Sequence, residues 1–208
     1  MFQNRRAAGE LLAQRLRTEA QPIVLGIARG GVIVAEAVAG VLAAPLDIVV
    51  IRKVGHPLQP ELALGAVAAS GETAVTVYAY EFSAESLAPL FSEQAERARL
   101  LESRLRAGRP PIDIAGNTAI LVDDGIATSA TMACAIAHAR HAGAQRIVCA
   151  VPVAPVESLE QLASKCEAIV VLVPSRDRDF AVGRFYADFR EVDDRQVSDA
   201  LARSSKVE

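Results

Sequence analysis

The sequence predicts an α/β fold, in which an open, mainly parallel, twisted sheet carries helices on both faces and a small hood or appendage at the C-terminus. Short apolar runs alternate with longer segments of helical periodicity, as in parallel strands joined by right-handed crossovers. Hydrophobic residues make up 51% of the 208 residues and aromatic residues only 4%. Small aliphatic side chains suit strands that are buried on both faces. At this length we expect a single domain over residues 1–208.

The first half of the chain begins with a helix. Ala8, Leu11, Leu12 and Leu16 recur at helical spacing, which predicts an amphipathic helix over 6–20. The Gly- and Pro-rich stretch 54–61 is expected to be a loop, part of a cover over a ligand site. The other elements expected here are a strand at 23–27, a tight turn at 29–31, a helix at 32–42, and strands at 46–51, 62–69 and 74–80.

A charged helix is predicted next, over 83–106, within a helical insertion of about 83–108. Ser83 is a suitable first cap, and Gly108 with the prolines after it ends the helix. A hood-like segment over about 175–208 closes the chain, and its tail from about Ser198 is expected to fray. Between them we expect strands at 118–122, 146–151 and 168–173 and helices at 130–141 and 156–164.

Composition and charge exclude several classes of protein. The net charge of −3 argues against a nucleic-acid partner, because binding to phosphate backbones needs a positive field. No apolar run reaches the roughly 18 residues that span a membrane, so we expect a cytoplasmic protein without a membrane partner. Cys134, Cys149 and Cys166 show neither disulfide nor zinc spacing and are interpreted as reduced core thiols.

The segment from Ala119 to Met132 is the most informative of the chain. Four apolar residues of a predicted strand are followed by Asp123 and Asp124, and small and hydroxyl residues then lead into a helix. Ligands of open α/β sheets bind at the carboxyl ends of strands, and a helix start binds phosphate. The carboxylates could hold vicinal sugar hydroxyls, or a hydrated Mg²⁺. A purely structural strand end that caps the next helix is the alternative.

This segment closely resembles the ribose-phosphate-binding motif of type I phosphoribosyltransferases, where two acids precede a Thr-Gly-x-Thr loop. Ser129 stands at the position where the family usually has Gly. A serine fits there only if its φ is negative or if a modest strain is tolerated. Ala127 stands where hypoxanthine-type enzymes have an Asp thought to act on the base, and adenine-type members also have Ala. The resemblance implies that Asp123 and Asp124 hold the ribose hydroxyls and Mg²⁺, and that Thr128 to Thr131 hold the 5-phosphate. The residues of the whole expected ribose-phosphate site are Asp123, Asp124, Gly125, Ala127, Thr128, Ser129, Ala130 and Thr131.

The same resemblance assigns the leaving pyrophosphate to two other segments. Ala28, Arg29 and Gly30 occupy the family's pyrophosphate loop, which often contains a cis peptide bond. Arg52 and Lys53 close the second predicted strand at the same edge of the sheet, where a basic residue contacts pyrophosphate. Arg52 and Lys53, together with Asp123 and Asp124, are the expected catalytic residues. A plain tight turn and a solvated strand end are the alternatives, and His56 is interpreted as a loop residue without a catalytic role.

Near the C-terminus, the aromatic segment 180–190 loosely resembles the base-binding segment of hypoxanthine-type enzymes. It suggests Phe180, Val182, Tyr186 and Asp188 as base-binding residues. A packing strand with Tyr186 and Phe189 facing inward fits the sequence equally well.

The expected reaction is transfer of ribose 5-phosphate from phosphoribosyl pyrophosphate to a nitrogenous base, a purine or a pyrimidine, with Mg²⁺ and release of pyrophosphate. A homodimer is a further expectation from the family. A regulatory module of the same fold that senses phosphoribosyl pyrophosphate without turnover is the alternative. The chain also resembles a less-characterised group of phosphoribosyltransferase-like proteins that share Arg-Gly-Gly and Gly-His-Pro, and this likeness implies no substrate.

Overall fold

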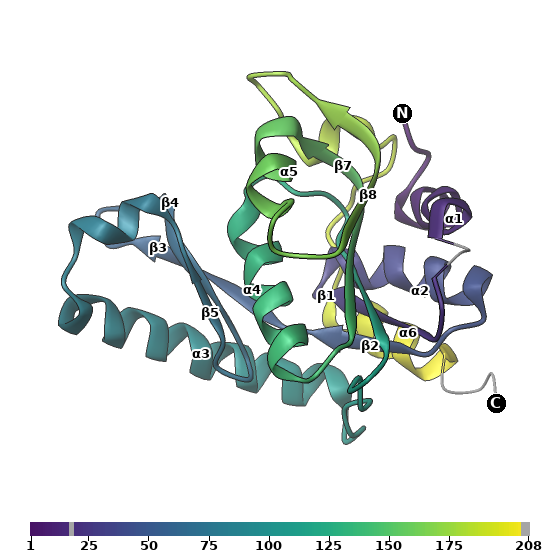
Figure 1. Ribbon diagram of the computed structural model, residues 1–208, viewed down its shortest axis with the longest axis horizontal. Coiled ribbons are helices and arrows are strands. Elements are labelled where there is room, and N and C mark those ends of the chain that lie inside the picture. Colours follow the sequence, from purple (N-terminus) through teal and green to yellow (C-terminus); the bar gives the residue numbers. More distant parts are fainter. Residues whose placement is uncertain (17–18, 205–208) are drawn as a thin grey trace.

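The computed structural model describes residues 1–16 and 19–204, and its centre is a five-stranded parallel sheet in the order β2-β1-β6-β7-β8 (Figure 1). The strands are β1 (Pro22–Ile27), β2 (Leu46–Val49), β6 (Thr118–Val122), β7 (Arg146–Pro155) and β8 (Ala168–Ser175). All neighbouring strands are parallel. The predicted fold class is confirmed. The strand order reverses between β1 and β6, and open sheets of this kind bind ligands at such a point.

Helices cover both faces of the sheet because neighbouring strand residues point to opposite sides. Ile120 and Val122 pack under α1 (Arg5–Leu16), α2 (Gly30–Leu42) and α6 (Asp194–Ser204). Ala119 and Leu121 pack under α4 (Ser129–His141) and α5 (Val156–Leu162). This burial on both faces explains why the strands are apolar without alternation.

A second unit, here called the arm (residues 51–106), extends away from the central sheet toward the left of Figure 1. Its antiparallel sheet packs on α3 through Val54, Val67 and Ala95. The elements of the arm are β3 (Ile51–His56), β4 (Gln59–Ala68), β5 (Thr73–Val75), a 3₁₀ helix (Val77–Glu81) and α3 (Ala84–Arg106). The predicted cap is correct, since the Ser83 hydroxyl accepts a hydrogen bond from the backbone N–H of Ser86.

Three predictions made from the sequence for this region are wrong. The expected loop 54–61 is largely a hairpin of β3 and β4, in which Val54 is buried and pairs with Gly65. The second parallel strand ends at Val49, and the chain passes at Val50 into the antiparallel sheet. The expected strand 74–80 is short, since β5 ends at Val75 and a 3₁₀ helix follows.

The C-terminal end of α3 is fixed to the central sheet by a buried ion pair. Arg106 Nη1 lies 2.6 Å from Asp47 Oδ1, and the side chains are only 11% and 8% exposed. Arg106 Nη2 also donates to the carbonyl of Ile48, while the N–H of Ile112 donates to the second oxygen of Asp47. Because α3 ends here, this contact sets where the arm meets the sheet.

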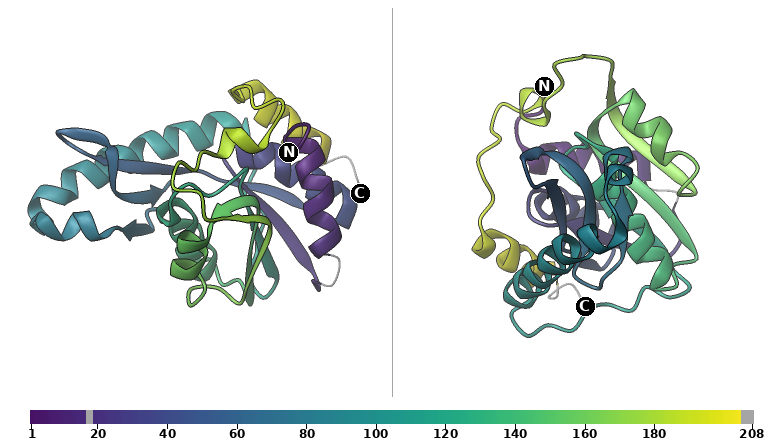
Figure 2. Two further views of the ribbon diagram at one scale, coloured as in Figure 1. Left: turned by 90° about the horizontal axis from the view of Figure 1, so that it is seen from above. Right: turned by 90° about the vertical axis from the view of Figure 1, so that its left-hand side faces the viewer.

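The C-terminal segment crosses the molecule from the end of β8 to α6, passing close to the N-terminus (Figure 2). The N–H of Phe2 donates to the carbonyl of Phe185, and the N–H of Ala187 donates to the carbonyl of Phe2. The expected frayed tail is wrong as far as Ser204, because Val197, Ala200 and Leu201 form a buried face of α6. The first helix was expected to extend to residue 20, but α1 ends at Leu16. Residues 17, 18 and 205–208 lie outside the described part.

The three cysteines are free thiols, of which Cys134 and Cys149 are buried and Cys166 is half-buried. Within the described residues, no helix is both long and apolar enough to cross a membrane.

Candidate functional site

Two loops meet at the point where the strand order reverses: the Arg-Gly-Gly turn after β1 and the acidic segment after β6. A Cβ atom on Gly31 would lie 2.6 Å from the carbonyl oxygen of Val122 and 2.8 Å from the Cα of Asp123. On Gly30 it would lie 1.9 Å from Asp124 Oδ2. Such contacts are impossible, so both glycines are needed for the acidic pair to lie against the turn. The peptide bond between Ala28 and Arg29 is cis, as the resemblance implied.

A cavity of about 270 Å³, here called the first cavity, opens between these loops and β3. It brings together most of the residues predicted to hold the ribose and its phosphate, with Lys53 facing them from the arm. The residues of its wall are Ile27, Ala28, Ile51, Lys53, Asp123, Asp124, Gly125, Ile126, Ala127, Thr128, Thr131 and Met132. Acidic, hydroxyl and cationic side chains therefore line one small space.

The two acids at the end of β6 have different surroundings. Asp123 Oδ1 accepts a hydrogen bond from the backbone N–H of Asp124. Burial and the neighbouring carboxylate of Asp124 hold the pKa of Asp123 well above its ordinary value, and the positive charge of Lys53 opposes this. An acid in such a place is favoured in its charged form by a bound cation and by hydroxyl groups that donate to it.

Asp124 is held by an arginine from the first helix. Arg5 Nε lies 2.7 Å from Asp124 Oδ2, and the side chains are 11% and 16% exposed. The same guanidinium donates to the carbonyl of Arg190 and lies 3.9 Å from the centre of the Phe189 ring. Arg5 thus joins the acidic segment to the C-terminal segment.

The start of α4 forms the part of the first cavity that was predicted to hold the phosphate. Thr128 precedes the helix in an extended conformation, with no capping hydrogen bond from its side chain. The first N–H groups of a helix lack partners within it and carry the positive end of its dipole, so they favour an anion. Thr128 and Thr131 line the cavity, while the Ser129 hydroxyl instead contacts Gln161 Oε1 of α5 at 2.5 Å. Ser129 is not among the residues with positive φ, so it fits the position usually held by Gly.

A second cavity of about 450 Å³ adjoins the first and shares Ala28 and Ile51 with it. Three arginines from α1, the Arg-Gly-Gly turn and β3 line it. Its wall consists of Arg5, Ala28, Arg29, Gly30, Ile51, Arg52, Leu101, Phe189, Glu191 and Val192. Arg52 Nε donates to Gln94 of α3 at 3.0 Å. The pair Arg52–Lys53 is therefore placed differently from the prediction, since it lies inside β3 and its two side chains serve neighbouring cavities.

The comparisons with known proteins agree with this arrangement. The family model described as "phosphoribosyl transferase domain" matches residues 2–189. The chain belongs to this family. In the Mycobacterium tuberculosis strains CDC 1551 and H37Rv, relatives provisionally named phosphoribosyl transferases are 40% identical over 99% of this chain. The chain spans only 47% of the length of these relatives. The crystal structure of the TT1426 protein from Thermus thermophilus is 42% identical, with a TM-score of 0.83 over 97% of this chain and 98% of that one.

Among the residues that the resemblance suggested for base binding in this phosphoribosyl transferase domain, Tyr186 has a packing role. Its ring is stacked on Phe189 at 4.9 Å and lies 5.4 Å from Phe2, and it is buried. Its hydroxyl donates to the backbone carbonyl of Asp124 at 2.6 Å. This is the packing alternative that the sequence left open, although the segment 182–185 is a 3₁₀ helix rather than a strand. The suggestion that Tyr186 is a base-binding residue is therefore corrected, because its ring is already covered.

The other three suggested residues are spread over the hood. Val182 lies against the acidic segment, where a Cβ on Gly125 would be 2.5 Å from its side chain. The ring of Phe180 packs 5.4 Å from that of Phe185. Asp188 forms an ion pair with Arg190 at 2.7 Å, and neither it nor the other two lines the first or the second cavity. Only Val182 thus lies beside the ribose motif, and base binding by these residues stays a prediction.

Sequence reasoning missed three residues that contact the site: Arg5, Gln161 and Asp194. Arg5 and Asp124 are 119 residues apart, and Arg29 and Asp194 are 165 apart. No local pattern marks such partners. The one available signal was the pair Arg5–Arg6 at the start of the first helix, and it does not indicate which acid Arg5 meets.

Proposed function

We propose that this chain binds phosphoribosyl pyrophosphate and transfers its ribose 5-phosphate to a nitrogenous base. The observation that carries the proposal is the first cavity, where the acidic end of β6 and the start of α4 face a common space of suitable size. An acidic strand end alone would serve a structural role, and a helix start alone would bind any anion. Together they match a ligand with hydroxyl groups at one end and a phosphate at the other.

The proposed pose follows from the charges. The 5-phosphate lies at the first turn of α4, where Thr128 and Thr131 donate hydroxyl hydrogen bonds. The ribose hydroxyls donate to Asp123 and Asp124. The pyrophosphate then extends past Ala28 toward the second cavity, where Arg29 and Arg52 supply positive charge, with Lys53 on the near side.

The chemistry proposed for this pose is displacement at C1 of the ribose, with pyrophosphate leaving as the nitrogen of a base arrives. Such a reaction asks the protein mainly for orientation and for neutralisation of the leaving charge. Fixing the sugar at both ends supplies the orientation. The arginines of the second cavity neutralise the leaving charge.

Mg²⁺ is a proposed cofactor, which the two acids fit only in part. Among the described residues, no cluster of three or more His, Cys, Asp or Glu side chains could hold a metal ion by itself. One oxygen of Asp124 is already paired with Arg5. Magnesium retains several waters and is often bound by one or two carboxylates together with substrate phosphates. We therefore propose that Mg²⁺ binds with the donor and neutralises its leaving phosphates, while Asp123 contacts the ion's water shell.

Calorimetric titration with phosphoribosyl pyrophosphate, with and without Mg²⁺, tests the proposal. We expect Mg²⁺-dependent binding that is lost in the variant Asp123→Asn and retained in Asp199→Asn, which changes an exposed acid of α6. Absence of binding at millimolar ligand would overturn the proposal. Binding with no release of pyrophosphate across a panel of purines and pyrimidines would instead favour the sensing module. The expected homodimer stays a prediction that light scattering can check.

A further inference from the structure

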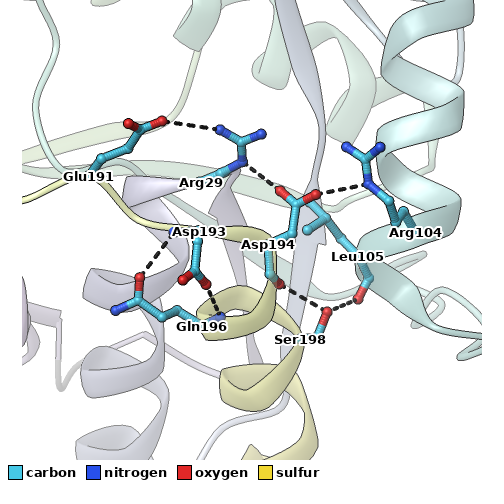
Figure 3. Close-up of polar contacts among 8 residues, drawn as sticks. All are labelled: Arg29, Arg104, Leu105, Glu191, Asp193, Asp194, Gln196 and Ser198. Carbon is cyan, nitrogen blue, oxygen red and sulfur yellow. Dashed lines mark hydrogen bonds and ion pairs between the residues drawn. The ribbon is translucent and has the colours of Figure 1, made fainter.

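Asp194, the first residue of α6, connects two arginines that come from different parts of the fold (Figure 3). Its Oδ1 lies 2.7 Å from Arg29 Nε and its Oδ2 lies 2.8 Å from Arg104 Nε. Arg29 belongs to the turn after β1 and lines the second cavity, whereas Arg104 belongs to the last turn of α3. One carboxylate therefore joins the anion-binding turn, the arm and the C-terminal helix.

The backbone that carries this carboxylate is held by hydrogen bonds that are independent of the arginines. The Asp193 side chain accepts from the N–H of Gln196, and the Gln196 side chain accepts from the N–H of Asp193. This reciprocal capping arrangement sets the start of α6. The Ser198 hydroxyl contacts the carbonyl oxygens of Asp194 and Leu105, so the same turn is also attached to the end of α3 (Figure 3).

The second acid near Arg29 is held differently. Glu191 Oε1 lies 3.7 Å from Arg29 Nη1, and the Glu191 side chain is 89% exposed. A contact of this length between exposed groups is screened by solvent and fixes little. Glu191 therefore carries the same charge as Asp194 at a similar place, without a comparable hold on the guanidinium.

We propose that Asp194 is a positioning residue, which holds the Arg29 guanidinium at the wall of the second cavity for the pyrophosphate of the donor. A guanidinium has five N–H donors in a rigid fork. Asp194 uses the Nε side of that fork, and the terminal nitrogens remain for a phosphate. This inference rests on the proposed function and adds to it a residue from the C-terminal helix.

Two opposing effects decide whether removal of Asp194 weakens or strengthens pyrophosphate binding. Removing Asp194 removes a negative charge near the anion, which favours binding, but the charge is one-third exposed and screened. It also frees the Arg29 side chain, which must then be immobilised when the anion binds. That ordering costs roughly two- to tenfold in affinity. We expect the loss of order to be the larger effect.

The experiment measures binding of inorganic pyrophosphate with Mg²⁺ and, separately, of ribose 5-phosphate. Asp194→Ala is expected to weaken pyrophosphate binding about fivefold and to leave ribose 5-phosphate binding unchanged. Asp194→Asn retains one acceptor oxygen and should lie between this variant and the wild type. Glu191→Gln is the matched charge control, expected to change neither affinity by more than about twofold.

A double-mutant cycle shows whether Asp194 acts through Arg29. In the Arg29→Ala background, Asp194→Ala should have no further effect on pyrophosphate binding. Equal or tighter pyrophosphate binding by Asp194→Ala or Asp194→Asn would overturn the positioning role and make Asp194 a competitor for Arg29. Parallel loss of both ligands would overturn it as well, because it would indicate a general structural defect. Failure of the wild type to bind either ligand would overturn the proposed function itself.

Discussion

Arg5 and Asp124 form a 2.7 Å ion pair between the first helix and the end of the sixth strand, with both side chains mostly buried. The pair gives Asp124 a structural role beside its proposed role in ribose binding. Replacing Asp124 would leave a partly buried guanidinium without its partner, which costs stability as well as affinity. Asp123, which has no arginine partner of this kind among the described contacts, is therefore the cleaner position for testing the ligand.

Gly30→Ala is predicted to disrupt the site. Its Cβ would lie 1.9 Å from Asp124 Oδ2 and 3.0 Å from Arg5 Nε, so the Asp124 carboxylate must shift from its place beside Arg5. We expect a loss of about 2–4 kcal/mol in the free energy of unfolding, together with loss of phosphoribosyl pyrophosphate binding, measured by urea titration and calorimetry.

The control for this change is Gly40→Ala, in the same helix α2. No atom lies within 4 Å of the added Cβ. Alanine is the better helix former, so we expect a gain of about 0.5–1 kcal/mol and unchanged binding. A stable Gly30→Ala protein with wild-type affinity would contradict the role given to this glycine.

Thr131→Val is predicted to weaken ribose 5-phosphate binding by roughly 10- to 150-fold, because a hydrogen bond to a charged group is worth about 1.5–3 kcal/mol. Ser129→Gly should change it by less than about threefold, because the Ser129 hydroxyl contacts Gln161 and does not line the first cavity. Calorimetry on both variants checks the difference. A larger loss in Ser129→Gly than in Thr131→Val would mean that the serine hydroxyl, and not the hydroxyl of Thr131, contacts the phosphate.

Arg106→Leu is predicted to destabilise the protein by about 3–5 kcal/mol, since it leaves the buried carboxylate of Asp47 without its ion partner. Arg97→Ala removes an exposed pair with Glu93 on the same helix and should cost less than about 0.5 kcal/mol. Chemical unfolding of the two variants gives the comparison. Similar stability of both would show that the arm is held to the sheet in another way.

The three thiols are predicted to react at different rates at pH 8. Burial raises the pKa of Cys134 to about 12. The hydrogen bond between Cys149 and Cys166 raises the pKa of the buried Cys149 and lowers that of the half-buried Cys166. Because the thiolate is the reactive form, Cys166 should be alkylated first and the other two only after unfolding.

Mass spectrometry of the labelled protein over time measures this order, and Cys166→Ser should remove the fast phase. Rapid labelling of Cys134 in the folded protein would contradict the burial seen at that position.

The central sheet could be predicted from the sequence because β1, β6 and β7 are mostly buried and appear as apolar runs. The acidic segment could be predicted because its acids and hydroxyls are contiguous. The hairpin of β3 and β4 was missed, because the Gly and Pro residues between its strands suggested a loop and strand pairing is not a local property. The partners Arg5 and Asp194 were beyond reach for the same reason, since each meets its contact across more than a hundred residues.

The last helix shows a different kind of error. Val197, Ala200 and Leu201 already have the spacing of a buried helical face. The expectation of a frayed tail relied on nearness to the end of the chain, although the apolar pattern predicted packing. The hood was predicted in outline, but its aromatic residues were assigned to a ligand where the structure uses Tyr186 to support the carbonyl of Asp124.

The contact between Arg29 and Asp194 also has a consequence for the order of events during synthesis. The turn that contains Arg29 leaves the ribosome 165 residues before its carboxylate partner. Domains form as units once their distant contacts become available. The parallel sheet could form in a nascent chain that has been translated only as far as β8, but Arg29 would then lack its partner Asp194. The guanidinium that lines the second cavity is therefore anchored only after α6 has been translated.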